Sequence, residues 1–503
     1  MRTDKGKREN SKARTDKKEQ TEMRGRTGKC PVAGKCGGCK WIDKDYEEQL
    51  AEKSRRFSKL MEPYCRPEAI IGMEQPAHYR HKVHAVFGED RRHQPISGIY
   101  EEKSHRIVPV DSCYIEDETA DAIIVTIREM LKSFRIRPYN EDTGYGLLRH
   151  VLIRKGYATG QVMVVLVLAS PILPSKNNFV KALLKKHPEI TTVVVNVNDR
   201  DTSMVLGAKE QVIYGKGYIE DVLCGKVFRI SPASFYQVNP AQTEKLYGKA
   251  MEYAGLTGEE TVLDAYCGTG TIGIIASDSA REVIGVELNK NAVWDAKVNA
   301  KRNEVHNIRF YENDAGRFLT QADLKVDVLL MDPPRAGSSE EFLNSVARIR
   351  PAKVVYISCN PETLARDLAL YQQIGYQAQE IQPVEMFSFT GHVETVVQLS
   401  KGEIDSKSIQ VELSLEDMDM SGFQSNVTYN QIKEWVKEQT GLHVSSLYIA
   451  QVKRKYGLDV GPNQNPAKTE GGRVPQCPPE KEAAIKAALE HFMMLPVVET
   501  EGA

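Results

Sequence analysis

The 503-residue sequence lacks the features of a membrane or secreted protein. No apolar run approaches the roughly 20 residues that a membrane-spanning helix needs. The polar N-terminus also lacks the apolar core of a secretory signal peptide. A chain of this length is too long for one hydrophobic core, so about two to four domains are expected. We therefore expect a cytoplasmic protein built of several domains.

The chain also lacks an overall excess of charge, with a net charge of -1, but its charges are unevenly distributed. Residues 1–29 hold 11 Lys/Arg against 5 Asp/Glu and almost no apolar side chain. Such a segment cannot offset the entropy lost on ordering, so we predict a disordered basic tail. Its charge suits a polyanion such as RNA, and a solvated tail without a partner is the simpler interpretation.

Two regions of regular pattern follow the tail. Between residues 78 and 230, short alternating runs broken by Gly, Asp and Asn predict a mainly antiparallel sheet. Helices are expected within it at 118–133 and 176–187. From 243 to 400, apolar strands alternate with helical stretches. That alternation predicts a largely parallel sheet with helices on both faces.

The stretch VLDAYCGTGTIG places Asp264 at a strand end, before a glycine-rich turn and a helix. Glycines let the backbone approach a ligand closely, and a helix N-terminus favours polar or negative groups. About twenty residues further on, Glu287 ends the next strand, where a carboxylate can accept both hydroxyls of a ribose. The chain lacks G-x-G-x-x-G and a phosphate-binding loop, so S-adenosylmethionine fits better than NAD or ATP. A glycine turn without a ligand is the alternative.

Two acidic residues at later strand ends extend this pattern. Asp314 in RFYENDA is placed either to bind an adenine amine or to cap a helix. Asp332 in MDPPRAG precedes two prolines, which stiffen the chain and fix its direction. In an open parallel sheet the ligand crevice lies beyond the carboxyl ends of the strands. We therefore expect four residues to converge on one cleft: Asp264, Glu287, Asp332 and Cys359.

Cys359 follows the apolar strand VVYIS. A buried structural cysteine is the usual interpretation of this residue type, but the position at the sheet edge favours a nucleophile. Uracil C5 is a poor nucleophile, and a thiolate that adds to C6 gives C5 the carbanion character needed to accept a methyl group. A base must then remove the C5 proton so that the thiol can leave. Glu394, just before the last strand, is the candidate base, and an edge-strand charge is the alternative.

Five motifs resemble, in this order, those of the RNA (uracil-5-)-methyltransferase family: SFYQVNP, LDAYCGTGTIG, DPPRAG, SCNPETLARDL and HVETV. The resemblance implies a class I, Rossmann-like α/β domain that depends on S-adenosylmethionine and methylates uridines in 23S rRNA or tRNA. By motif, Cys359 would be the nucleophile and Glu394 the base. The family often has Asn where this chain has Thr271, so a cofactor contact there is not implied. The residues implied to hold S-adenosylmethionine are Gln237, Tyr266, Glu287 and Asp332, with Asp314 close to the adenine.

A group of cysteines lies near the N-terminus, in CPVAGKCGGC. Cys30, Cys36 and Cys39 have the spacing C-x5-C-x2-C, Cys113 is the natural fourth member, and Cys65 is a competitor for that place. In a long cytosolic chain such cysteines indicate metal binding rather than disulfides. Four cysteines suit zinc or an iron-sulfur cluster, and the spacing does not decide between them. The family resemblance implies a four-iron, four-sulfur (4Fe-4S) cluster, as in its 23S rRNA branch. Because methyl transfer moves no net electrons, a folding or RNA-docking role for this cluster is the simpler interpretation.

The region around Cys113 is rich in basic and aromatic residues that suit RNA. Rings can stack on unpaired bases while cations contact phosphates. Single-stranded or flipped-out RNA is expected, because a side chain cannot reach C6 of a stacked base. A solvated charged sheet face is the alternative. The basic residues are Arg80, Lys82, Arg91, Arg92, Lys103, Arg106, Arg149 and Arg154, and the aromatic ones are Tyr79, Phe87 and Tyr100.

These patterns predict an α/β methyltransferase domain, a mainly β central domain that bears an iron-sulfur site, and a small α-helical C-terminal extension. In the extension, 427–459 predicts two helices around a Gly turn and 479–493 a third. Three roles are open for this extension: a recognition helix, a protein-docking appendage and a purely stabilising appendage. The expected regions are a tail at 1–29, an iron-sulfur region at 30–77 and 105–115, an RNA-binding domain at 78–230, a methyltransferase domain at 231–400 and an accessory module at 401–503.

The leading hypothesis is a monomeric enzyme that makes 5-methyluridine in 23S rRNA, with tRNA as the second choice of substrate. Methylation of an exocyclic amine is a different reaction that DPPR suggests, but Arg335 stands where those enzymes would place an aromatic ring. A non-catalytic iron-sulfur RNA-binding protein is a third hypothesis. The intact Cys359, Glu394 and cofactor motifs argue against it.

Overall fold

The computed structural model describes residues 30–102, 104–200, 204–321, 324–401, 429–456 and 477–491. The chain divides into two compact units, residues 1–404 and 405–503. The basic tail predicted at 1–29 lies outside the described residues. No helix in the described ranges is both long enough and apolar enough to cross a membrane.

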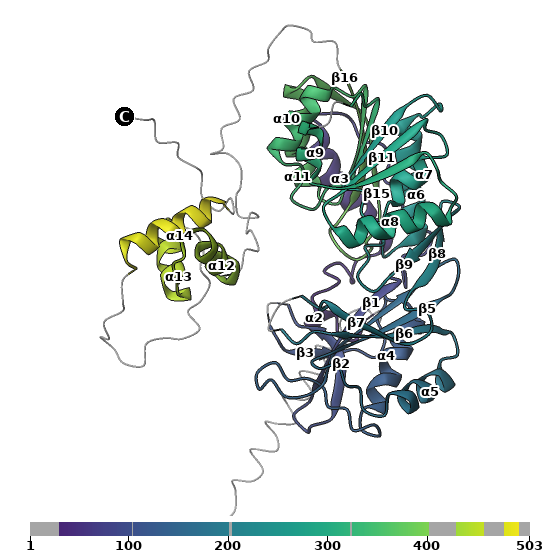
Figure 1. Ribbon diagram of the computed structural model, residues 1–503, viewed down its shortest axis with the longest axis vertical. Coiled ribbons are helices and arrows are strands. Elements are labelled where there is room, and N and C mark those ends of the chain that lie inside the picture. The colour runs from purple at the N-terminus through teal and green to yellow at the C-terminus, as the bar shows by residue number, and fades with distance from the viewer. Residues whose placement is uncertain are drawn as a thin grey trace, which may run out of the picture. The chain divides into compact units, whose positions relative to one another are not determined.

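The first unit contains a central seven-stranded sheet made of residues 82–214. Its strands are β1 (Lys82–Glu89), β2 (Pro95–Tyr100), β3 (Ile107–Pro109), β4 (Leu148–Lys155), β5 (Val162–Leu168), β6 (Ile190–Val197) and β7 (Lys209–Tyr214). The order is β3-β2-β1-β4-β5-β6-β7, and only β5 and β6 are parallel neighbours (Figure 1). The predicted mainly antiparallel sheet is confirmed. Both predicted helices are also present, as α4 (Glu118–Met130) and α5 (Lys176–Lys186).

Both faces of this central sheet are buried, which its sequence pattern does not reveal. All seven residues of β5 are buried. Helices α4 and α5 pack on one face. On the other face, Ile219 and Ile230 share a hydrophobic cluster with Val165 and Val194. They belong to a hairpin that was not predicted, β8 (Ile219–Leu223) and β9 (Lys226–Ile230).

The second sheet of this unit has the order β12-β11-β10-β13-β14-β16-β15. Its strands are β10 (Thr261–Ala265), β11 (Glu282–Glu287), β12 (Ile308–Glu312), β13 (Val328–Met331), β14 (Lys353–Ser358), β15 (Tyr376–Val384) and β16 (Glu394–Lys401). The first five are parallel neighbours, and β16 is antiparallel to β14 and β15. All the predicted strands are present. The prediction missed β15, whose outer half carries exposed polar side chains, and the reversal of β16.

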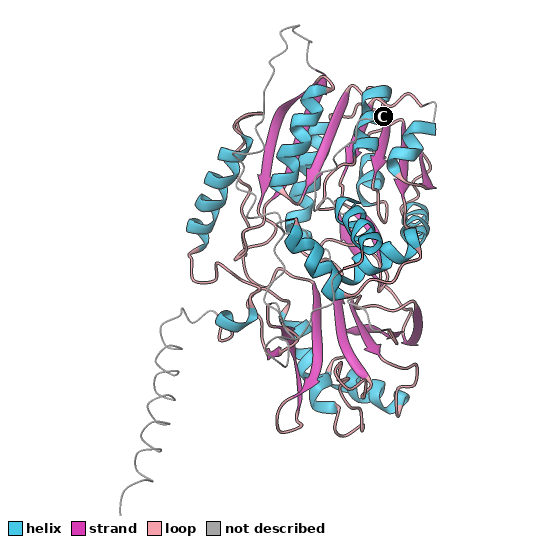
Figure 2. Ribbon diagram, turned by 90° about the vertical axis from the view of Figure 1, so that its left-hand side faces the viewer, coloured by secondary structure: helices cyan, strands magenta, loops and turns pink. Residues whose placement is uncertain are grey.

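Helices cover both faces of the second sheet (Figures 1 and 2). One layer contains α6 (Pro240–Ala254), α7 (Thr271–Ala276) and α8 (Lys290–Arg302). The opposite layer contains α9 (Ala315–Gln321), α10 (Glu340–Ile349), α11 (Pro361–Gln373) and α3 (Tyr46–Met61). Phe57 and Met61 of α3 lie in the same core cluster as Leu263 and Val354. The segment that carries the first cysteines therefore continues into a helix of this layer.

The second unit is described at α12 (Tyr429–Thr440), α13 (Ser446–Lys455) and α14 (Pro479–His491). These helices bury Ile432, Ile449 and Ile485 in a core of their own. Gly441, with a φ of 69°, allows the chain to turn after α12. The hydroxyl of Ser445 accepts a hydrogen bond from the Tyr448 N–H at 3.3 Å and so caps α13.

Candidate active site

The topology of the second sheet brings the predicted acidic residues and Cys359 to one edge. Asp264 lies near the carboxyl end of β10, and Glu287 is the last residue of β11. Asp332 and Cys359 directly follow β13 and β14. Because these four strands are parallel, their carboxyl ends share one edge of the sheet.

Glu394 reaches the same edge from the opposite direction. It is the first residue of β16, which runs antiparallel to β14 with Thr395 opposite Ser358. One further step in this register places Glu394 opposite Cys359. A carboxyl group and a thiol are therefore neighbours at the edge where the acidic residues gather.

Asp264 holds the glycine-rich turn in place. Its Oδ2 accepts a hydrogen bond from the Gly273 N–H at 2.7 Å, and its buried Oδ1 has no hydrogen-bond partner in the described structure. Burial raises the pKa of Asp264 to about 8, and the charges of Asp332 and Glu287 add to this effect. A buried acceptor without a partner, at the ligand edge of the sheet, fits a site that a bound molecule completes.

The turn itself requires glycine. Gly270 has a φ of 80°, and a Cβ atom there would lie 2.9 Å from Phe310 Cζ. The Gly268 N–H donates to Glu287 Oε2 at 3.1 Å, while the Asn289 N–H donates to Oε1 at 2.8 Å. These two bonds aim the carboxylate of Glu287, which stays partly exposed and keeps lone pairs for a ligand's hydroxyls.

Tyr266 and Asp314 lie on either side of the glutamate strand. Tyr266 adopts a left-handed φ of 64°, and its ring centroid lies 5.3 Å from that of Phe342. Non-glycine residues in this region are concentrated at functional sites. Asp314 Oδ1 accepts from the Arg317 N–H at 3.0 Å, so this carboxylate caps α9. In the structure without a ligand, Asp314 therefore acts as a helix cap.

Sequence reasoning missed Tyr247. This tyrosine lies on the buried face of α6, and its hydroxyl forms a hydrogen bond with the side chain of Gln237. Burial raises the pKa of Tyr247 well above its usual range, and the charges of Asp332, Asp264 and Glu394 raise it further. A tyrosine on the buried face of a helix is a signal of such a site, because its hydroxyl needs a polar partner when buried.

The thiol of Cys359 is half-buried. Burial raises its pKa to about 11, the charges of Glu394 and Asp332 add to this effect, and Arg335 opposes it. Burial likewise raises the pKa of Asp332 to about 7. The free site therefore holds Cys359 as a thiol at neutral pH, and its reaction requires the proton to leave.

Glu394 is 4% exposed. Burial raises its pKa well above the usual range, the charge of Asp332 adds to this effect, and Arg335 opposes it. A carboxyl group with a raised pKa is a stronger proton acceptor once it is ionised. Thr363 Oγ1 donates to the Arg335 carbonyl at 3.1 Å, which joins the DPPR segment to the first turn of α11.

Known proteins resemble this chain over the same residues. Residues 45–402 match the tRNA (Uracil-5-)-methyltransferase family. The chain belongs to this family. An uncharacterized RNA methyltransferase of Clostridium acetobutylicum is 42% identical over 383 residues, which cover 74% of this chain and 83% of the relative. One of Caldanaerobacter subterraneus is 42% identical over 379 residues, which cover 74% and 84%.

The methyltransferase also resembles a solved structure, Pyrococcus abyssi tRNA (uracil-54, C5)-methyltransferase in complex with S-adenosyl-L-homocysteine. The TM-score is 0.61 at 27% identity, with 72% of this chain and 86% of the other covered. The prediction of an RNA (uracil-5-)-methyltransferase is therefore confirmed at the level of the family.

The four predicted cysteine ligands of the methyltransferase line one small cavity: Cys30, Cys36, Cys39 and Cys113. They are free thiols, and the Gly38 N–H donates to Cys36 Sγ at 3.4 Å. Burial raises the pKa of Cys39 to about 12, with the charges of Cys36 and Cys30 adding to the effect. Among the described residues, no three or more His, Cys, Asp or Glu side chains are spaced to hold a metal ion. Four cysteines around one cavity have the ligand type and number of an iron-sulfur cluster. In the described structure, however, their sulfur atoms are not at the spacing of metal ligands.

Cys65 does not compete for this cavity. Its Sγ donates to the Gln379 carbonyl on β15 at 3.3 Å. It therefore lies on the methyltransferase sheet, away from the four cysteines that line the cavity.

Two of the three aromatic residues that were predicted to contact RNA are buried, so this part of the prediction is wrong. Tyr79 is buried, and its hydroxyl donates to the Ser388 carbonyl at 3.3 Å. Phe87 is buried in the core of the central sheet. Neither ring is available to stack on a base. Phe87 lies on the face of the sheet that α4 and α5 cover, whereas Tyr79 precedes β1 and packs in a cluster with Cys30, Cys39 and Cys113.

Three of the basic residues that were predicted to lie on the RNA surface are buried or half-buried. Arg149 donates to the Asn198 carbonyl at 3.0 Å, and Arg154 donates to the Ser231 carbonyl at 2.5 Å; both arginines are buried. Burial lowers the pKa of Lys82 to about 8, with help from Arg154 and Arg80. Arg91, Arg92 and Arg106 are exposed, and Lys103 lies outside the described residues.

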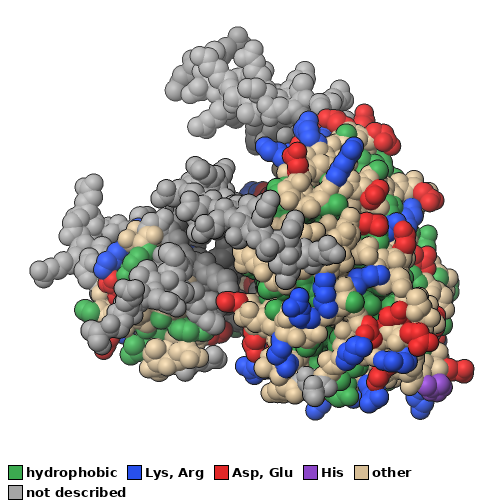
Figure 3. All heavy atoms as spheres, turned by 90° about the horizontal axis from the view of Figure 1, so that it is seen from above, with side chains coloured by type: hydrophobic (Ala, Val, Ile, Leu, Met, Phe, Trp, Pro, Cys, Tyr) green, Lys and Arg blue, Asp and Glu red, His purple; other side chains and the backbone are tan. Residues whose placement is uncertain are grey.

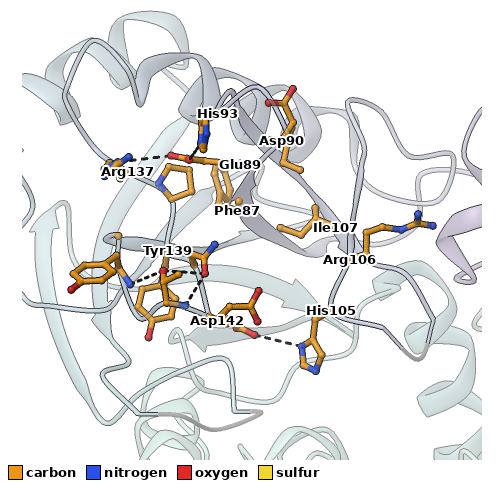
Figure 4. A pocket seen from close by; sticks show the side chains of 18 of the residues that line it. Phe87, Glu89, Asp90, His93, His105, Arg106, Ile107, Arg137, Tyr139 and Asp142 are labelled. Carbon is orange, nitrogen blue, oxygen red and sulfur yellow. Dashed lines mark hydrogen bonds and ion pairs between the residues drawn. The ribbon is translucent and has the colours of Figure 1, made fainter. Parts of the chain in front are cut away.

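The central domain contains a hollow of about 650 Å³ between β1–β3 and the loop 137–146 (Figure 4). Tyr145 on its rim is 78% exposed. His105 Nδ1 lies 3.5 Å from Glu141 Oε2, and Arg137 Nε lies 4.0 Å from Glu89 Oε1. Cations and carboxylates therefore alternate around the hollow. They are also interspersed on the face of the molecule shown in Figure 3, so neither surface has a single sign of charge.

Proposed function

We propose that this enzyme transfers a methyl group from S-adenosylmethionine to C5 of a uridine in 23S rRNA, with tRNA as the alternative target. The proposed route is a covalent bond between Cys359 Sγ and C6 of the base. The observation that carries it is the placement of Cys359 and Glu394 opposite each other at the edge where Asp332 lies.

The chemistry follows from these two side chains. The Cys359 thiol releases its proton to water, its sulfur bonds to C6, and the electron pair of the C5–C6 double bond moves toward C5 and O4. S-adenosylmethionine would supply an electrophilic methyl group to C5, with its S–CH3 bond broken and S-adenosylhomocysteine as the leaving group. Glu394, as a carboxylate, then takes the C5 proton, the C5–C6 double bond re-forms and the sulfur leaves as a thiolate. The net change is one C5 proton replaced by one methyl group.

The cofactor would lie over the glycine-rich turn. The unpartnered Asp264 Oδ1, the glycine at 270 and the aimed carboxylate of Glu287 all fit a nucleoside ligand there. Gln237, Tyr266, Asp314 and Asp332 surround the same edge in the proposed assignment. The S-adenosyl-L-homocysteine in the Pyrococcus abyssi relative supports this choice of cofactor.

We further propose that the four cysteines around the small cavity hold a 4Fe-4S cluster. Their position supports this: Cys30, Cys39 and Cys113 pack against one hydrophobic cluster beside the active-site sheet. A cluster would replace the protons that burial keeps on these thiols.

The cluster proposal predicts a brown protein when it is purified without air. We expect broad absorption near about 400 nm and about four iron atoms per chain. Cys113→Ser should lose most of the colour and iron. Cys65→Ser is the matched control, since this cysteine lies on β15, and it should keep both. A colourless wild-type protein loaded with zinc would contradict the proposal.

Methylation of the two RNAs with the purified enzyme distinguishes 23S rRNA from tRNA as the target. We expect S-adenosylmethionine with a labelled methyl group to label 23S rRNA and leave tRNA unlabelled, with the label in 5-methyluridine. RNA that contains 5-fluorouridine should form a complex that survives denaturation, because fluorine cannot leave as a proton. Labelling of tRNA alone would overturn the rRNA target and keep the chemistry. Methylated exocyclic amines without a trapped complex would overturn the chemistry.

A further inference from the structure

The loop that leads into Glu394 is held by the cysteine-bearing segment near the N-terminus. This loop, residues 385–393, joins β15 to β16. The Trp41 N–H donates to the Phe389 carbonyl at 3.1 Å, and the Phe389 N–H donates to Gln49 Oε1 at 2.7 Å. Both backbone groups of Phe389 are thus bonded to residues more than three hundred positions away in the chain.

Phe389 needs this support. It is 1% exposed and has a left-handed φ of 63°, a conformation that bulky residues rarely adopt. Such a residue persists only when its surroundings fix it, and these conformations cluster at functional sites. Gln49 is fully buried, and its own amide is oriented by a hydrogen bond from Nε2 to the Lys44 carbonyl at 3.0 Å.

The rest of the loop is anchored to the same N-terminal region. Lys53 Nζ lies 2.5 Å from Glu385 Oε2 and 3.1 Å from the Phe387 carbonyl, with both charged side chains fully buried. The Tyr79 hydroxyl donates to the Ser388 carbonyl at 3.3 Å. The side chain of Phe389 packs in one cluster with apolar residues and three of the cysteines: Ile42, Met73, Tyr79, Ile115, Cys30, Cys39 and Cys113.

The loop ends where the proposed base begins. Glu394 pairs with Val384 as the first pair of the β15–β16 hairpin, so residues 385–393 close the hairpin directly beside its carboxylate. His392 of the same loop lies near Arg335, whose charge contributes to lowering the pKa of this histidine after burial. The anchored loop therefore borders the Cys359 and Glu394 edge of the sheet.

We propose that Gln49 is a positioning residue for Glu394, acting through Phe389 and the loop 385–393. The inference rests on the proposed function, because it assigns Gln49 to the step in which Glu394 removes the C5 proton. Formation of the bond between Cys359 and C6 and methylation of C5 do not use this carboxylate. Loss of Gln49 should therefore slow only the release of product from the enzyme.

The test is Gln49→Met, which keeps the shape of the side chain and removes both of its hydrogen bonds. We expect turnover on ordinary RNA to fall by about 10- to 100-fold, the range for a displaced catalytic group. A methylated covalent adduct should accumulate on denaturing gels. Trapping of 5-fluorouridine RNA should keep its wild-type rate, because that complex forms before the step in which Glu394 takes the C5 proton. Gln49→Glu, whose protonated carboxyl can make the same two bonds, should restore turnover.

Two controls separate this proposal from general damage. Gln382→Met removes another buried glutamine, whose Nε2 donates to the Ala69 carbonyl at 2.7 Å, and leaves the contacts of Phe389 intact. The Gln382→Met enzyme should methylate RNA with turnover and without accumulating the methylated covalent adduct. If Gln49→Met does not fold, Gln49→Asn shortens the side chain by one methylene and should show the same adduct.

Wild-type turnover in Gln49→Met, or equal losses of trapping and turnover, would overturn the positioning role. Failure of the wild-type enzyme to trap 5-fluorouridine RNA would instead overturn the proposed function. The two failures are therefore distinguishable.

Discussion

Cys359→Ser is expected to abolish methylation, with a loss of about 10⁴-fold or more, the scale seen when a covalent nucleophile is removed. A hydroxyl at this half-buried position stays protonated beside Glu394 and Asp332 and cannot add to C6. The measurements are transfer of labelled methyl groups to RNA and the denaturation-resistant complex with 5-fluorouridine RNA. Both should disappear.

Cys224→Ser is the matched control for that experiment. Cys224 is also half-buried, and burial raises its pKa to about 11, as it does for Cys359. It follows the hairpin strand β8, where its N–H donates to Glu244 Oε1 at 3.0 Å. Near-normal turnover is expected for this variant. Near-normal turnover of Cys359→Ser would show that methyl transfer here proceeds without a sulfur adduct.

The sequence was sufficient to place Cys359 at the carboxyl edge of the second sheet, because parallel strands end on one side of their sheet. The same rule does not place Glu394, which begins a strand instead of ending one. It reaches the edge only because β16 is antiparallel to β14. That reversal depends on pairing between residues 353–358 and 395–400, and no local pattern encodes it.

Long-range packing also explains the errors in the central domain. The run LLRHVLIRK mixes basic and apolar residues and so indicates a half-exposed strand, but every residue of β4 except Lys155 is buried. The hairpin of residues 219–230 covers one face of the sheet from a distance in the chain. Arg154 donates to the Ser231 carbonyl just after that hairpin, and Arg149 donates to the Asn198 carbonyl just after β6. Tyr247 was missed for a related reason, since its polar partners come from other elements of the fold.

The cysteine-bearing segment and the active site form one structural unit in this enzyme. Helix α3 packs into the methyltransferase sheet, and the buried pair of Lys53 and Glu385 joins that helix to the loop before Glu394. Because an unpaired buried charge is strongly unfavourable, the two elements are expected to stay together in the folded protein. The cavity lined by the cysteines is thereby connected to the step that we assign to Glu394.

Glu394→Gln should separate methyl transfer from product release. The variant keeps the size of the side chain but cannot accept the C5 proton, so turnover should fall by about 10²- to 10⁴-fold. Ordinary uridine RNA should then accumulate as a methylated adduct on Cys359. Glu362→Gln, which neutralises an exposed carboxylate in the first turn of α11, is the control and should release product normally.

The dependence on pH tests the same assignment in the wild-type enzyme. Glu394 must be ionised to act as the base, and burial with the charge of Asp332 raises its pKa. The fraction of carboxylate therefore increases as the pH rises through that raised pKa, and product release should accelerate in the same direction. Adduct should accumulate in the wild type at low pH and in Glu394→Gln at every pH. Accumulation in Asp332→Asn with normal release by Glu394→Gln would move the role of the base to Asp332.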